Sequence, residues 1–151
     1  MTTTTAPQVA LTRVFNAPRA LVYRAFTDPE QLASFWGPHG NKIDQVEMDI
    51  RPAGRISWHE TFPADPEIWT NGWIDLTEVV DGEVLDGIMH ITGHLPGNFQ
   101  PFETRMRLEF HDEPEGQTRI EVSQWLPEHL AAPTINGWGE QFEKLGTTLG
   151  L

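Results

Sequence analysis

The spacing of hydrophobic residues predicts one strand and two helices at the start of the chain. Residues 9–15 alternate between apolar and polar side chains, as a half-buried strand does. Residues 16–26 place apolar side chains three or four positions apart, which predicts a helix. A second, shorter helix is expected between Asp28, which can cap its start, and Gly37, after which Pro38 forbids continuation. The stripe expected to be buried on the first helix is Leu21, Val22, Ala25 and Phe26.

From residue 42 to residue 125 the hydrophobic period changes to two, which is typical of strands. In residues 102–110 the apolar side chains share one face and the charged side chains share the other. The Asp81-Gly82 pair between two such segments predicts a hairpin. Because short turns join consecutive segments, we expect an antiparallel sheet with one apolar face.

The last segment, from about residue 134, returns to helical spacing. Its stripe is Ile135, Trp138, Phe142, Leu145 and Leu149. Because an apolar sheet face needs a cover, we predict an α+β fold class. The expected architecture is a curved antiparallel sheet of about six to seven strands around a long C-terminal helix, with two short helices after the first strand. Residues 9–151 would form one domain, and residues 1–8 a flexible tail.

Composition narrows the classes of partner. Lys and Arg number 10 against 22 Asp and Glu, so the formal net charge is −12. Such a chain repels phosphate backbones and anionic lipid, so we expect no nucleic-acid and no membrane partner. The absence of cysteine excludes disulfides and thiolate chemistry and suits a reducing compartment. The first residues lack the basic flank and apolar centre of a secretion signal, so we expect a cytoplasmic protein.

Short motifs along nearly the whole chain resemble a known family. In family order they are Ala17-Pro18, Thr27-Asp28-Pro29, Trp36-Gly37-Pro38, Arg51-Pro52, Gly54 and Gly137-Trp138. The resemblance is to homologues of the activator of heat-shock protein 90 ATPase, small members of the START/SRPBCC superfamily. Two positions depart from the family pattern: Phe35 stands where tryptophan is usual, and Ala53 replaces the first glycine of a Gly-Gly pair.

This resemblance implies the helix-grip fold, in which the two short helices close one end of the curved sheet and brace the long helix. It leaves the activity open, because a fold does not imply a function. The superfamily includes lipid carriers, polyketide cyclases, hormone receptors and co-chaperones.

A helix laid across a concave sheet leaves a gap unless large side chains fill it. An open gap would take a small hydrophobic or aromatic molecule. The alternative is that tryptophan and methionine side chains close it into a solid core. The residues expected to face this space, and to bind a ligand there, are Met48, Trp58, Ile88, His90, Met106, Leu108, Val122, Gln124, Trp138 and Phe142.

His90 and Glu60 are the candidate catalytic residues, because a buried imidazole or a desolvated carboxylate can act as a general acid or base. The alternatives are a core histidine bonded to a backbone carbonyl and a carboxylate at the wet end of its strand. Asp86 could be the partner of His90, and Gln124 could orient a ligand or be an ordinary strand-end amide. His90 and His94 are four positions apart, but that spacing serves helices and not strands. We therefore expect no metal site and no cofactor.

Three hypotheses for the function follow. The first is binding of a small hydrophobic or aromatic molecule between the sheet and the C-terminal helix. The second is an enzyme of the polyketide cyclase or dehydratase type that acts on such a ligand. The third, a chaperone-interacting protein, comes from the family resemblance alone, and we expect no chaperone partner. A homodimer through an exposed edge of the sheet stays open.

Overall fold

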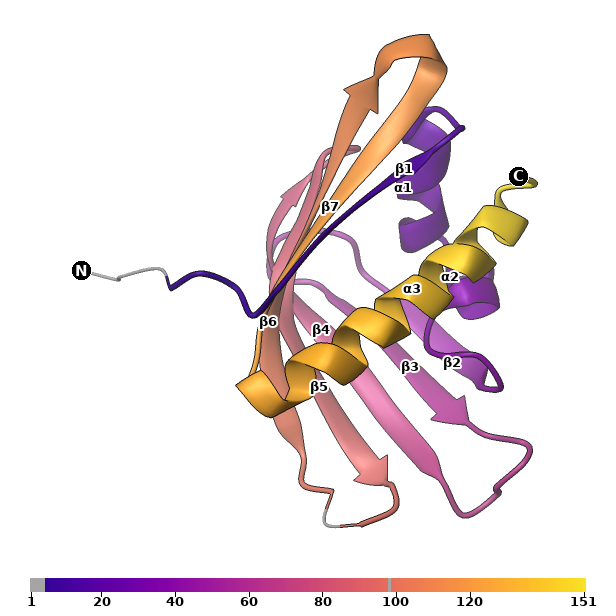
Figure 1. Ribbon diagram of the computed structural model, residues 1–151, viewed down its shortest axis with the longest axis vertical. Coiled ribbons are helices and arrows are strands. Elements are labelled where there is room, and N and C mark those ends of the chain that lie inside the picture. The colour runs from indigo at the N-terminus through magenta and orange to yellow at the C-terminus, as the bar shows by residue number, and fades with distance from the viewer. Residues whose placement is uncertain (1–4, 98) are drawn as a thin grey trace.

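Seven antiparallel strands form one sheet in the computed structural model, which describes residues 5–97 and 99–151 (Figure 1). Their order across the sheet is β1-β7-β6-β5-β4-β3-β2, so β1 and β2 are its two edges. Each strand from β2 to β6 pairs with the next one in the chain, and β7 pairs with β1. The strands are β1 (Val9–Phe15), β2 (Lys42–Met48), β3 (Arg55–Thr61), β4 (Trp69–Val80), β5 (Val84–His94), β6 (Phe102–Glu113) and β7 (Gln117–Trp125).

Three helices cover the inner face of this sheet. The long helix α3 (Ala131–Thr148) crosses it, and α1 (Arg19–Thr27) and α2 (Pro29–Phe35) lie beside the C-terminal half of α3 (Figure 1). Two single 3₁₀ turns, η1 (Pro114–Gly116) and η2 (Glu128–Leu130), precede β7 and α3. The predicted α+β class, the curved antiparallel sheet and the order of the helices are confirmed.

Helix α2 forms because its start is capped and its apolar face is buried. The Asp28 carboxylate accepts a hydrogen bond from the Gln31 backbone N–H at 3.0 Å, as the sequence predicts. A helix of two turns is unstable alone in water, so packing must hold it. Leu32 and Phe35 provide that packing, and both are buried in the main core.

Trp36, the residue that ends α2, connects the three layers of the core. Its ring meets Trp58 of β3 and Trp138 of α3 edge-to-face, with ring centroids 5.4 and 5.7 Å away. Such pairs stabilise a core beyond the area that they bury. The two short helices therefore brace the contact between the sheet and α3 at one end.

The buried faces of α1 and α3 each differ in part from the predicted stripe. Leu21 is 53% exposed, and Tyr23 takes its place in the core on α1. The ring of Tyr23 packs on Phe110 of β6, so α1 is rotated about its axis toward that strand. Ile135 is 42% exposed, so it is not part of the buried face of α3, which consists of Ala131, Trp138, Gln141, Phe142 and Leu145.

Ile88 and His90 lie on the outer face of β5, and the prediction that they face the inside is wrong. Residues paired across neighbouring strands share a face. Ile88 pairs with Arg105 and His90 with Glu103, whereas Leu85 pairs with the buried Leu108. Apolar residues occupy consecutive positions in this strand, so alternation does not reveal its phase. Charge pairing decides it, because Arg105 and Glu103 have to point to water.

Part of the expected flexible tail, residues 1–4, lies outside the described residues. The remainder contacts the end of β7. The Trp125 indole N–H donates to the Thr5 carbonyl at 2.7 Å, and the Leu126 backbone N–H donates to Gln8 Oε1 at 3.0 Å. The flexibility of residues 1–8 stays a prediction.

Candidate functional site

A cavity of about 180 Å³ lies between the sheet and the first half of α3. Its walls are largely apolar: Trp36, Trp58, Met89, Ile91, Phe102, Met106 and Trp138. Gly37, Pro38 and Gly137 also line it, and four polar side chains, Glu60, Gln124, Thr134 and Gln141, complete it. A dry apolar cavity of roughly 150 Å³ is large enough for benzene. This cavity therefore has room for a molecule of about one aromatic ring with a small substituent.

The space between α2 and the sheet is nearly filled. The gap there is only about 20 Å³ and is lined by Leu32, Leu108 and their neighbours. The core is thus solid at the end where α2 packs and hollow at the other end. Tryptophans 36, 58 and 138 stand at the boundary, since they pack on one another and line the larger cavity.

Gln124 and Gln141 have fixed side-chain orientations. The indole N–H of Trp138 donates to Gln124 Oε1 at 3.0 Å, and the backbone N–H of Gly37 donates to Gln141 Oε1 at 2.6 Å. Both donors lack acceptor character, so each amide must present its oxygen to them and its NH₂ group elsewhere. Gln124 is 2% exposed and Gln141 is 7% exposed, and neither NH₂ nitrogen is both buried and unpaired, so both keep contact with the space inside the cavity.

Glu60 reaches the cavity wall from β3 as part of a polar network. Its carboxylate accepts hydrogen bonds from the Thr70 hydroxyl at 2.9 Å and the Asn41 amide at 2.6 Å. The ammonium group of Lys144 on α3 donates to Asn41 Oδ1 at 3.0 Å and to the Pro38 carbonyl at 3.1 Å. Burial lowers the pKa of Lys144, partly opposed by Glu60. The network ties α3 to the loop between α2 and β2, beside the cavity.

The structure places the predicted site residues in three groups. Trp58, Met106, Gln124, Trp138 and the catalytic candidate Glu60 line the cavity. Met48, Leu108, Val122 and Phe142 pack in the core but are not among the residues that line this cavity. Ile88 and His90 lie on the outer face, as described above. Whether any of these residues binds a ligand stays a prediction.

His90 has partners that a cavity residue would not have. Its imidazole stacks on Trp73, with ring centroids 4.9 Å apart, and its two nitrogens lie 3.3 Å from Asp75 and 3.4 Å from Glu103. The proposed partner Asp86 lies on the same outer face, but its carboxylate pairs with Arg105 and Arg107 at 2.9 and 3.0 Å. His90 therefore has no route to act on a molecule inside the sheet.

Sequence reasoning missed several residues of the cavity. Met89 and Ile91 were missed because the phase of β5 was reversed. Gln141 was missed although it lies three positions after Trp138, within the apolar stripe of α3. A polar residue at a buried helical position is a signal for a specific partner, because an unpaired buried amide is costly.

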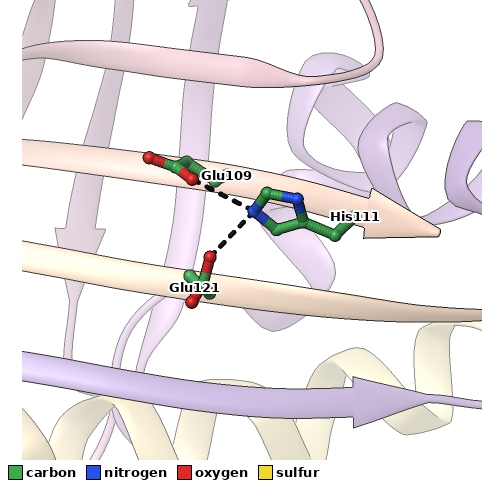
Figure 2. Close-up of side chains that lie close together, drawn as sticks. All are labelled: Glu109, His111 and Glu121. Carbon is green, nitrogen blue, oxygen red and sulfur yellow. Dashed lines mark hydrogen bonds and ion pairs between the residues drawn. The ribbon is translucent and has the colours of Figure 1, made fainter. Parts of the chain in front are cut away.

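On the outer face, His111 of β6 lies between two carboxylates (Figure 2). Its Nε2 atom is 3.0 Å from Glu109 and 2.8 Å from Glu121. Three such groups can hold a metal ion, but Arg107 donates to Glu109 at 2.7 Å and Arg119 is 3.9 Å from Glu121. The hydrogen bond from Arg107 is the main reason that the pKa of Glu109 is lowered. The arginines already balance these carboxylates, and the expectation of no metal site stays a prediction.

Among the helices of the described residues, none is both long and apolar enough to cross a membrane. A search among curated proteins finds no match to this sequence.

Solved structures share this fold over nearly their whole length. A protein from Chromobacterium violaceum is 23% identical, with a TM-score of 0.78, over 92% of this chain and 94% of that one. A protein from Mycobacterium smegmatis is 22% identical, with a TM-score of 0.77, over 93% of this chain and 89% of that one. The AHSA1 protein from Silicibacter pomeroyi is 16% identical, with a TM-score of 0.74, over 94% and 96%.

The sequence itself, in addition to the fold, matches a known family. The family model described as "Activator of Hsp90 ATPase homolog 1-like protein" matches residues 16–150, which include all three helices and six of the seven strands. The chain therefore belongs to the family of activator of Hsp90 ATPase homolog 1-like proteins and has its helix-grip fold.

Proposed function

We propose that this protein binds a small hydrophobic or aromatic molecule in the cavity between its sheet and α3. The observation that carries the proposal is the cavity itself, about 180 Å³ of space walled by three tryptophans and two methionines. The cavity is open to solvent, so its apolar walls lie against water. A bound hydrophobic molecule would displace that water and cover these walls.

Methionine methyl groups provide a direct test with an internal control. Met89 and Met106 line the cavity, whereas Met48 packs in the core without lining it. Titration of the protein with toluene should shift the methyl NMR signals of Met89 and Met106 and leave that of Met48 in place. Unchanged Met89 and Met106 signals up to saturating toluene would contradict the proposal.

Two glycines of α3 give a matched pair of variants. Gly137 lines the cavity and Gly139 does not, and a Cβ at either position meets no heavy atom within 4 Å. Leucine at either position should favour the helix by up to about 1 kcal/mol. Gly137→Leu should nevertheless abolish the toluene shifts because its side chain occupies the cavity, and Gly139→Leu should keep them.

The enzyme hypothesis retains one of its two candidate residues. His90 lies on the outer face, while Glu60 lines the cavity with both carboxylate oxygens engaged by Asn41 and Thr70. This arrangement supports a structural role for Glu60 at the cavity wall. Binding without turnover is therefore the function that we propose.

A further inference from the structure

The polar groups of the cavity define the chemistry of its ligand more narrowly. We propose that the cavity takes an uncharged molecule with one hydrogen-bond acceptor, such as a ketone, ester or amide carbonyl, which receives hydrogen bonds from the Gln124 and Gln141 side chains. This inference rests on the proposed binding function and adds a selectivity to it.

The side-chain amides of Gln124 and Gln141 each have N–H donors from which no group of the described residues accepts a hydrogen bond. Their oxygens are held by the Trp138 indole N–H and the Gly37 backbone N–H. Among residues 5–97 and 99–151, neither amide nitrogen donates a hydrogen bond to another protein group. Both residues line the cavity and are almost fully buried. Neither amide nitrogen is both buried and unpaired, so water in the open cavity accepts from these N–H groups, and an acceptor on the ligand would replace that water.

The charges around the cavity favour an uncharged ligand. The one ionisable side chain among the described residues that line the cavity is the carboxylate of Glu60. The nearby ammonium of Lys144 is directed to the Pro38 carbonyl and Asn41 Oδ1 and does not line the cavity. A carboxylate ligand would thus be desolvated beside a like charge and without a cation, which is costly. A neutral carbonyl avoids this cost and accepts the same two hydrogen bonds.

The polar and apolar side chains of the cavity wall come from different elements. Gln124 belongs to β7 and Gln141 to α3, so their amides approach the cavity from its two opposite layers. The remaining walls are mostly aromatic rings and methionine side chains. A ring with a single carbonyl substituent matches this distribution of polar and apolar surface.

Three probes of nearly equal shape test the proposal. Acetophenone carries the carbonyl, α-methylstyrene replaces the oxygen by a CH₂ group, and benzoate adds a negative charge. Two hydrogen bonds of ordinary net strength predict that acetophenone binds roughly ten- to a hundredfold more tightly than α-methylstyrene. Benzoate should bind more weakly than either. Affinities can be followed by the Met89 and Met106 methyl signals.

Variants of the two amides show whether the preference has this origin. Gln124→Met and Gln141→Met keep the side-chain length and remove the N–H donors. Each should lower the affinity for acetophenone about threefold to tenfold more than that for α-methylstyrene, because loss of the amide oxygen also releases the Trp138 or Gly37 N–H and affects both ligands alike. Retained α-methylstyrene binding shows that the variants are folded. In the wild type, acetophenone should also shift two glutamine NH₂ signals that disappear singly in the two variants.

The possible failures can be told apart. If acetophenone and α-methylstyrene bind equally well, or if the amide variants lower both affinities alike, the acceptor selectivity is overturned and the binding function survives. Tighter binding of benzoate than of acetophenone would overturn the preference for an uncharged ligand. If none of the three probes binds, the proposed function fails, and this inference fails with it.

Discussion

The indole N–H of Trp138 donates to Gln124 Oε1 at 3.0 Å, which joins α3 to β7 through a buried hydrogen bond. Trp138 is 4% exposed and Gln124 is 2% exposed, so both partners lie in the interior between the helix and the sheet. The bond fixes the position of a tryptophan that lines the cavity and orients an amide that faces it. One contact therefore serves both the packing of the helix on the sheet and the shape of the candidate site.

A double-mutant cycle measures this bond. Trp138→Phe and Gln124→Met each remove one partner, and urea unfolding of the two single variants and the double variant should give a coupling energy of about 1 kcal/mol. A control cycle combines Gln124→Met with Trp69→Phe, because Trp69 is 39% exposed and stacks on His59. That coupling should be near zero. Equal couplings in the two cycles would contradict the assignment.

The N-cap of α2 supports a second prediction. Asp28→Ala removes the acceptor of the Gln31 N–H and should lower the free energy of unfolding by about 1 kcal/mol. Asp28→Asn keeps an acceptor oxygen and should cost less. Urea unfolding at neutral pH checks both variants. Equal stability of Asp28→Ala and the wild type would mean that the cap contributes nothing to holding α2.

The burial of Lys144 predicts how the stability of the folded protein changes with pH. Burial lowers its pKa in the folded protein below the ordinary value of 10.5, so in alkaline solution the unfolded chain binds more protons at this residue than the folded chain does. The burial penalty is complete at neutral pH and is relieved as the pH rises through the folded pKa toward 10.5.

The comparison with Lys144→Met isolates this effect, because other titrating groups are common to both proteins. The stability of the wild type relative to Lys144→Met should increase between pH 7 and about pH 10. Thermal or urea unfolding across this range provides the measurement. A constant difference, or a decrease, would show that burial does not perturb Lys144.

A variant of His90 tests which face of β5 points to solvent. Because its ring lies on the outer face against Trp73, His90→Ala should leave toluene affinity unchanged and alter stability by less than about 1 kcal/mol. Loss of toluene binding in His90→Ala would mean that His90 faces the inside of the sheet.

Met106→Trp, which puts a larger side chain into the cavity wall, should abolish toluene binding while the protein stays folded.

Local patterns were sufficient for most of the fold. Asp28 and Pro38 mark α2 correctly, and the alternation in residues 102–110 gives the true inner face of β6. The apolar face of the sheet and the matching stripe of the last segment predicted the placement of α3, and the motif resemblance supplied the position of the two short helices at one end of the sheet. Each of these features depends on residues that lie close together in the sequence or on short contiguous motifs.

The candidate site was harder to predict because it depends on strand register and on contacts between distant residues. In β5, Ile88, Met89 and Ile91 make both faces look apolar, and only the pairing with Arg105 and Glu103 shows which one faces water. The role of Gln141 depends on the backbone of Gly37, which is 104 positions away. No local pattern contains that information.

The proposal that the cavity holds a small molecule can be tested most directly by native mass spectrometry of the protein purified from its own host. The wild type and Gly139→Leu should carry a bound small molecule in addition to the 17.1 kDa chain, and Gly137→Leu should not. The absence of a bound molecule from the wild type, or its presence in all three proteins alike, would contradict the account.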